Sequence, residues 1–130
     1  MKLIVCLDDR CGMAFNKRRQ SRDRIQLADM RELVGDSTLA IAPYSERLIA
    51  DGGFSYTVYD NPLSSDEEYC FLETQAPTEC KLDGVVIYRW GRSYPSDVKF
   101  TLDISLFNLV EVREFVGSSH EKIIREIYEL

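Results

Sequence analysis

Two apolar runs constrain the fold of this chain more than any other feature of its sequence. Residues 2–8 (KLIVCLD) and 84–90 (GVVIYRW) are nearly continuous stretches of large apolar side chains. A short run of this kind, bounded by acidic residues or glycine, is typical of a strand buried on both faces. Such strands occur in sheets that carry a layer of structure on each side. We therefore expect an α/β protein built around a sheet.

Weaker patterns predict the remaining elements of the first half of the chain. A helix is expected over residues 22–34, capped by Ser21 or Asp23 and ended by Gly35. Residues 37–42 (STLAIA) are typical of a second strand. A short helix is expected after Ser45, closed by the glycines at 52–53.

The second half is dominated by predicted strands. They are expected over residues 54–60, 69–74, 84–90, 98–104 and 108–116, with the last two as antiparallel neighbours. Ser118 and Glu121 match a helix capping box, and apolar residues from Ile123 to Leu130 recur with helical spacing, so a terminal helix is expected. The prediction is one domain over residues 1–130, with a mixed sheet of five to seven strands covered by two main helices.

Length and composition exclude several classes of protein. A chain of 130 residues is the size of one domain. Its apolar runs are too short to span a bilayer, and residues 1–8 lack the features of a signal peptide. We therefore expect a cytoplasmic protein with no membrane partner.

The four cysteines contain no CxxC pair, and His120 is the only histidine, so neither a metal site nor a cofactor is expected. Any serine or cysteine triad would depend on His120.

The charge of the chain is strongly segregated. The net charge is −6, yet residues 10–24 contain six lysines and arginines against one acid, a local charge of +5. The rest of the chain therefore carries −11. A charge run is often only a solvated surface. Guanidinium groups crowded in this way are also suited to binding phosphate or carboxylate.

A second basic element lies at residues 117–122 (GSSHEK), where the expected helix would present its first backbone N–H groups to an anion. If the two segments meet in space, they would form one anion-binding site. Its candidate residues are Asn16, Lys17, Arg18, Arg19, Ser21, Arg22, Ser118, Ser119, His120 and Lys122. His120 is the one candidate for a general acid or base. The acidic pair Asp8–Asp9 is interpreted as answering the nearby arginines rather than as a metal site.

Two stretches, GMAFNKRRQSRD at 12–23 and EFVGSSHEKI at 114–123, resemble signatures of a group of small, uncharacterised bacterial proteins. Members of that group are sometimes labelled ribonuclease Z. The zinc enzymes of that name require several histidines in an H-x-H-x-D-H motif, and this chain has one histidine. The resemblance therefore implies no zinc-dependent ribonuclease activity.

A more distant resemblance is to dihydrofolate reductase. LIVCLDDRCGMAFN is similar to its first strand and loop, STLAIAPYSERLI to its second strand and nucleotide-side helix, and GVVIYRWGRSYPSDVKFTLDI to its cofactor-binding turn. This implies a dihydrofolate-reductase-like fold. Pro43–Tyr44 stands where a Gly-Arg pair would bind cofactor phosphate, and Trp90–Gly91 replaces a Gly-Gly turn. We therefore expect the fold without the reductase activity.

Three functions remain open from the sequence. The first is a protein that binds RNA or a nucleotide through the arginine-rich segment and the predicted helix start. The alternative is an interaction module that docks an acidic partner or a second copy of itself. The third is a small phosphoester hydrolase that uses His120.

Overall fold

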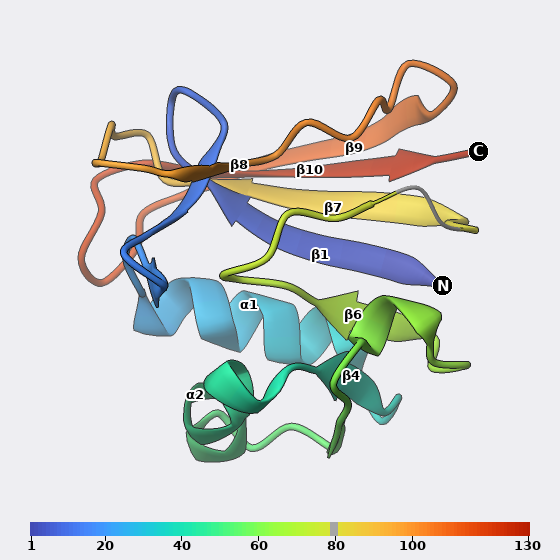
Figure 1. Ribbon diagram of the computed structural model, residues 1–130. Coiled ribbons are helices and arrows are strands. Elements are labelled where there is room, and N and C mark those ends of the chain that lie inside the picture. The colour runs from blue at the N-terminus through green and yellow to red at the C-terminus, as the bar shows by residue number, and fades with distance from the viewer. Residues whose placement is uncertain (79–80) are drawn as a thin grey trace.

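A seven-stranded mixed sheet organises the chain (Figure 1). The computed structural model describes residues 1–78 and 81–130, so Cys80 lies outside the described residues. The strand order is β5 (Tyr56–Val58), β4 (Leu39–Ile41), β6 (Tyr69–Phe71), β1 (Lys2–Leu7), β7 (Gly84–Arg89), β10 (Ile123–Glu129) and β9 (Asn108–Phe115). The first five strands are parallel neighbours, and β10 is antiparallel to both β7 and β9. The expected mixed sheet is confirmed.

The two apolar runs of the sequence form the centre of this sheet. β1 and β7 lie next to each other and are almost entirely buried, as their lack of alternation predicted. β1 also pairs with β6, so both of its edges are hydrogen-bonded. The ends of these strands are therefore rigid points from which loops can position side chains.

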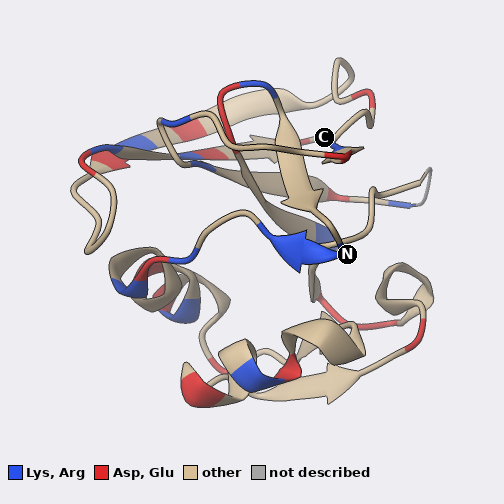
Figure 2. Cartoon of the chain, turned by 60° about the vertical axis from the view of Figure 1, so that its left-hand side comes forward, with Lys and Arg blue, Asp and Glu red and all other residues tan. Residues whose placement is uncertain are grey.

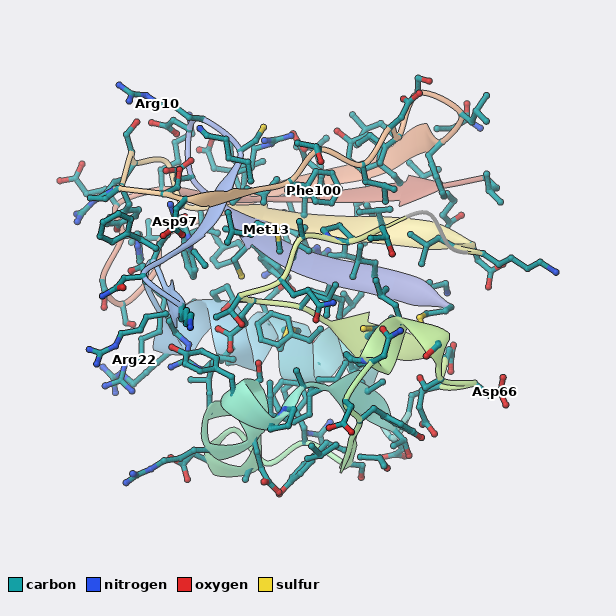
Figure 3. All side chains as sticks on the ribbon, in the orientation of Figure 1. Arg10, Met13, Arg22, Asp66, Asp97 and Phe100 are labelled. Atoms are coloured by element: carbon teal, nitrogen blue, oxygen red, sulfur yellow. The ribbon has the colours of Figure 1, made fainter. Side chains whose placement is uncertain are left out.

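Different layers cover the two faces of the sheet. α1 (Arg24–Val34) and α2 (Glu46–Asp51) contribute Met30, Val34 and Ile49 to one core, together with alternate residues of β1, β4 and β7. The other face is covered by Met13 and Phe100, from a small sheet and the chain that follows it (Figure 3). That small sheet consists of β2 (Gly12–Phe15) between β3 (Arg18–Arg19) and β8 (Val98–Lys99). Both α-helices thus lie on one face, where the cleft described below forms.

The first helix ends where the sequence predicted and begins at Arg24, two residues after the predicted start, with Asp23 rather than Ser21 as its cap. Asp23 has extended backbone angles and caps α1, accepting hydrogen bonds from the N–H groups of Ile25 and Gln26. Gly35 follows the last turn with φ of 62°, a conformation that favours glycine, and its N–H bonds to the carbonyl of Arg31. No helix in the described part of the chain is long and apolar enough to cross a membrane.

The predicted terminal helix is wrong, because the segment is the strand β10. Ile123, Arg125 and Ile127 face one side of this strand, and the cation among them hid the alternating pattern. Arg125 is 7% exposed and is tolerated because it forms ion pairs with Asp29 and Glu111. Because the buried Arg125 is paired, residues 123–129 form a strand although their isoleucines are spaced as in a helix.

The predicted pairing of 98–104 with 108–116 is also wrong. Only β8 forms in the first of these segments, and it pairs with β2 instead. The backbone N–H of Phe100 continues this contact by bonding to the carbonyl of Cys11. β9 pairs with β10 across the hairpin and lies at the edge of the main sheet.

Candidate functional site

The candidate site lies where β7 ends and β10 begins. Because the two strands are antiparallel, with Ile124 opposite Arg89, the residues that precede β10 lie beside those that follow β7. The ring of His120 consequently stacks on the ring of Trp90, with centroids 4.5 Å apart and planes 19° apart. Clefts outside the carboxyl ends of parallel strands are common ligand sites in α/β sheets.

The carboxylate of Asp23 is the centre of the site and is buried. In addition to capping α1, it accepts hydrogen bonds from the backbone N–H groups of Ser118 (3.0 Å) and Ser119 (2.7 Å). The Nδ1 of His120 lies 2.9 Å from Oδ2 of the same carboxylate. The arginine-rich segment and residues 117–122 therefore meet, as the anion-site hypothesis required. The anion that joins them is Asp23 itself.

These contacts set the charge state of Asp23. Burial alone would raise the pKa of its carboxyl group, but hydrogen bonds from His120, Ser118, Ser119 and Gln26 outweigh burial and hold the pKa well below its ordinary value. A carboxylate that stays charged requires a proton on the ring nitrogen that faces it. His120 therefore carries a hydrogen on Nδ1, and in the neutral ring Nε2 is then an acceptor.

Two hydroxyl groups face that acceptor. The Oγ of Ser21 lies 3.1 Å from Nε2 of His120, and the Oη of Tyr94 lies 3.0 Å from it. The two hydroxyl oxygens are 3.5 Å apart. Ser21, His120 and Asp23 thus form a continuous chain of hydrogen bonds from a hydroxyl to a buried carboxylate.

Gly117 makes the close approach of the two segments possible. A Cβ atom at this position would overlap Oδ2 of Asp23 and would lie 2.7 Å from Cδ1 of Ile123. The Gly117 N–H also bonds to the carbonyl of His120, which closes the turn. A residue with a side chain would force the turn away from the carboxylate.

A cleft of about 620 Å³ opens beside this site, between α1 and α2. Figure 2 shows basic residues along β3 and at the beginning of α1, and Figure 3 shows Arg22 projecting away from the sheet near the same end. The cleft combines two arginines and two aspartates with serine and apolar side chains. Its lining residues are Arg22, Asp23, Arg24, Leu27, Ala28, Leu48, Asp51, Gly52, Ser118 and Ser119.

Several residues of the predicted site lie elsewhere. Asn16 and Lys17 form the exposed turn between β2 and β3, with φ of 52° and 62°. Arg18 is exposed on β3, and Lys122 forms an exposed ion pair with Glu114 at 3.1 Å. Of the predicted set, the structure brings Ser21, Ser118, Ser119 and His120 around Asp23, with Arg22 at the cleft.

Arg19 is already occupied by a carboxylate of its own chain. Its guanidinium group makes two hydrogen bonds to Glu73, at 2.7 and 2.9 Å, and lies over the ring of Tyr44. These bonds to Glu73 raise the pKa of Arg19, with burial acting in the opposite direction. Ser45 donates a further hydrogen bond to Glu73 at 2.7 Å. The planar fork of Arg19 is therefore committed to a structural contact.

Asp8 also differs from its expected role. Its carboxylate accepts hydrogen bonds from the backbone N–H groups of Arg10, Gly12 and Tyr94 and from the amide of Gln20, but no guanidinium group contacts it among the described residues. Asp8 thus ties the loop after β1 to Tyr94. No cluster of histidine, cysteine and carboxylate side chains suited to a metal ion occurs within residues 1–78 and 81–130.

Sequence reasoning missed three functional features. The sequence places Arg24 in the basic segment without marking it as a site residue, Tyr94 only in the cationic and aromatic stretch Arg89–Tyr94, and Asp23 only as a possible helix cap. Asp23 and His120 are 97 positions apart. The sequence does hold a signal for a site built from a serine, a histidine and a carboxylate. The one histidine, His120, directly follows Gly-Ser-Ser, and the helix cap Asp23 lies two positions after Ser21.

Comparisons with known proteins show the fold and no more. No family model matches the sequence, and no curated protein sequence matches it. Among solved structures, the chain is similar to a dihydrofolate reductase from Enterococcus faecalis complexed with NADP(H) and RAB-propyl. The similarity has a TM-score of 0.64 at 11% identity and covers 98% of this chain and 94% of that one. The expected dihydrofolate-reductase-like fold is confirmed.

Proposed function

We propose that the cleft between α1 and α2 binds a small phosphate-bearing ligand of nucleotide size. The observation that carries the proposal is the position of Arg22 and Arg24, which line the cleft and form no ion pair within the described part of the chain. Uncommitted guanidinium groups at the edge of a concave site suit a phosphate group.

The size and lining of the cleft favour an organic ligand over inorganic phosphate. Its volume of about 620 Å³ falls in the ordinary range for small-molecule sites. Leu27, Ala28 and Leu48 supply an apolar surface for a flat ring. Asp51 stands among the lining residues and favours a ligand with hydrogen-bond donors, such as sugar hydroxyls, away from its phosphate.

The position of the phosphate follows from the role of Asp23. This carboxylate already accepts hydrogen bonds from the N–H groups of Ile25 and Gln26 in the first turn of α1 and from those of Ser118 and Ser119. The ligand's anion would therefore bind side chains rather than these backbone groups. The hydroxyl of Ser118 accepts a hydrogen bond from the N–H of Arg24 at 3.0 Å. Its own proton can therefore be donated to a phosphate oxygen held by the two arginines.

The reductase of similar fold is complexed with NADP(H), a phosphate-bearing dinucleotide. By the sequence resemblance, Pro43–Tyr44 stands in place of the Gly-Arg pair that would bind cofactor phosphate, and the Tyr44 ring lies 4.7 Å from the Arg19 guanidinium carbon. We therefore propose a different phosphate compound and no reductase activity. The resemblance to the group labelled ribonuclease Z names no substrate for the cleft.

A second candidate function rests on the turn between β2 and β3. Phe15 is 49% exposed there, and the exposed cations Lys17 and Arg18 form no ion pair within residues 1–78 and 81–130. This tip could stack on an RNA base or dock an acidic partner or a second copy of the chain.

One titration distinguishes these functions. Trp90 is the only tryptophan, and its ring stacks on His120, which is hydrogen-bonded to the cleft residue Asp23. Its fluorescence can therefore follow the addition of nucleoside monophosphates, NADP⁺, inorganic phosphate or a short single-stranded RNA. We expect monophosphates to bind, and Arg22→Gln or Arg24→Gln to weaken binding about tenfold or more, the worth of a charged hydrogen bond.

Arg18→Gln is the matched control, because it removes an equally exposed arginine from the same segment outside the cleft. Unchanged affinity in Arg22→Gln and Arg24→Gln would refute the cleft. RNA binding with a steep salt dependence that is lost in Arg18→Gln would support the turn instead. A salt-sensitive oligomer without nucleotide affinity would support the interaction module.

A further inference from the structure

Ser21, His120 and Asp23 are arranged as a nucleophile, a base and a carboxylate that orients the base. The distances along this chain are 3.1 Å from Ser21 Oγ to His120 Nε2 and 2.9 Å from His120 Nδ1 to Asp23 Oδ2. We propose that these residues form a catalytic triad with which the protein hydrolyses small acyl esters. This inference goes beyond the proposed binding function and does not depend on it.

The environment of the triad suits each role. The side chains of His120 and Asp23 are 1% and 0% exposed, so their hydrogen bond is shielded from water. Stacking on Trp90 holds the plane of the imidazole ring, and the N–H groups of Ser118 and Ser119 hold the carboxylate. Ser21 is only partly buried, so it is the most exposed of the three residues. The general logic of a triad is geometric and independent of fold.

The proposed reaction has two balanced steps. In the first, Oγ of Ser21 attacks the ester carbonyl carbon while His120 Nε2 takes the hydroxyl proton and then delivers it to the departing alkoxide. The bond to the alcohol breaks and an acyl-serine forms. In the second, water attacks the acyl-serine, loses a proton to Nε2, and the serine oxygen recovers that proton as the carboxylic acid leaves.

The structure also offers donors for the oxyanion. The backbone N–H groups of Ser21 and Arg22 make no hydrogen bond within the described part of the chain. The backbone N–H of the nucleophile itself is a common oxyanion donor in such sites.

A small cavity next to Ser21 indicates the size of the acyl group. It measures about 10 Å³, room for about one water molecule, and is lined by Cys6, Met13, Arg19, Gln20, Ser21, Leu72, Glu73 and Trp90. The Oε1 atom of Gln20 is buried there without a hydrogen-bond partner. A cavity of this size favours formyl or acetyl groups over longer acyl chains.

Tyr94 limits the activity of the triad. A neutral imidazole has one lone pair at Nε2, and both the Tyr94 and Ser21 hydroxyl groups lie within hydrogen-bond distance of it. When Tyr94 donates to this nitrogen, Ser21 has no base. Tyr94 is therefore a positioning residue whose removal should activate Ser21.

A fluorophosphonate probe tests the proposal directly, because it forms a stable ester only with activated serines. We expect one probe per chain by mass spectrometry, attached to Ser21 and absent in Ser21→Ala, while Ser64→Ala serves as a control serine on the exposed surface. Folded Asp23→Asn is expected to label on the order of 10³–10⁴-fold more slowly. Tyr94→Phe is expected to label about twofold faster, since Ser21 no longer shares the lone pair.

Two further measurements keep the test decisive if a triad variant fails to fold. Ser21→Cys changes one partly exposed atom, and its new thiol should react with iodoacetamide faster than Cys11 does. p-Nitrophenyl acetate should be hydrolysed in preference to the octanoate. The proposal is overturned if the unmodified protein does not label, if Ser21→Ala labels normally, or if folded Asp23→Asn labels at the original rate. Ser21→Ala should keep nucleotide affinity, so failure of one proposal leaves the other testable.

Discussion

The imidazole of His120 donates its Nδ1 hydrogen to Asp23 across 97 positions of sequence, at a distance of 2.9 Å. This contact joins the beginning of α1 to the turn before β10. It also aims the second ring nitrogen at Ser21. One hydrogen bond thus connects the stability of the fold to the chemistry of the site.

The stability of the protein should fall in acid because of Asp23. In the folded state burial raises the pKa of this carboxyl group, but the hydrogen bonds it accepts lower the pKa by more. The folded chain therefore favours the charged form more than the unfolded chain does. The stabilisation is therefore complete above the ordinary carboxyl pKa of about 4 and is lost as the pH falls through the lower folded value. Urea unfolding between pH 7 and pH 3 measures it.

Asp23→Asn is the control for this titration. The variant should be less stable than the original protein at pH 7, and the difference in the free energy of unfolding should shrink toward pH 3. A difference that stays constant over this range would show that the charge of Asp23 contributes nothing.

Gly117→Ala should disrupt the site more than an ordinary glycine substitution. The new methyl group would overlap the Asp23 carboxylate and approach Ile123, so we expect a loss of about 1–3 kcal/mol in the free energy of unfolding. Gly53→Ala is the matched control, since it meets no atom within 4 Å and carries only the cost of a positive φ, about 1 kcal/mol. Equal losses in the two variants would contradict the close approach.

Asp29 holds a buried ion pair that the strand β10 requires. It accepts hydrogen bonds from Tyr88, Arg113 and Arg125, at 2.7, 2.9 and 2.9 Å. Asp29→Asn leaves the Arg125 guanidinium inside the protein without a full counter-charge and should cost about 3–5 kcal/mol of stability. Breaking the exposed pair of Lys122 with Glu114 through Glu114→Gln should cost about 0–1 kcal/mol. Thermal unfolding of both variants checks the contrast.

Arg19→Gln separates structural from functional arginines. Because its guanidinium is committed to Glu73, which is 7% exposed, the substitution should lower stability by about 1–3 kcal/mol. It should leave nucleotide affinity unchanged, unlike Arg22→Gln. Loss of nucleotide binding with intact stability would place the ligand at β3 rather than in the cleft.

Local patterns predicted the central part of the fold. The unbroken apolar runs became β1 and β7, and the cap at Asp23 and the glycine at 35 bounded α1 within the predicted helix. These features depend on neighbouring residues, so they are legible in the sequence. Whether the two basic elements meet stayed open from the sequence; the structure brings them together at Asp23, while Arg18 and Lys122 of the candidate site face solvent.

The sequence by itself determined an α/β sheet, its buried strands, the first helix and the segregation of charge, because each is expressed within a few consecutive residues. The tertiary structure alone decided that residues 123–129 form a strand, since the pairing of Arg125 with Asp29 makes a cation acceptable on its buried face. That antiparallel strand carried His120 to Trp90 and Asp23. The site therefore arises from a long-range ion pair and a strand direction, neither of which leaves a local pattern.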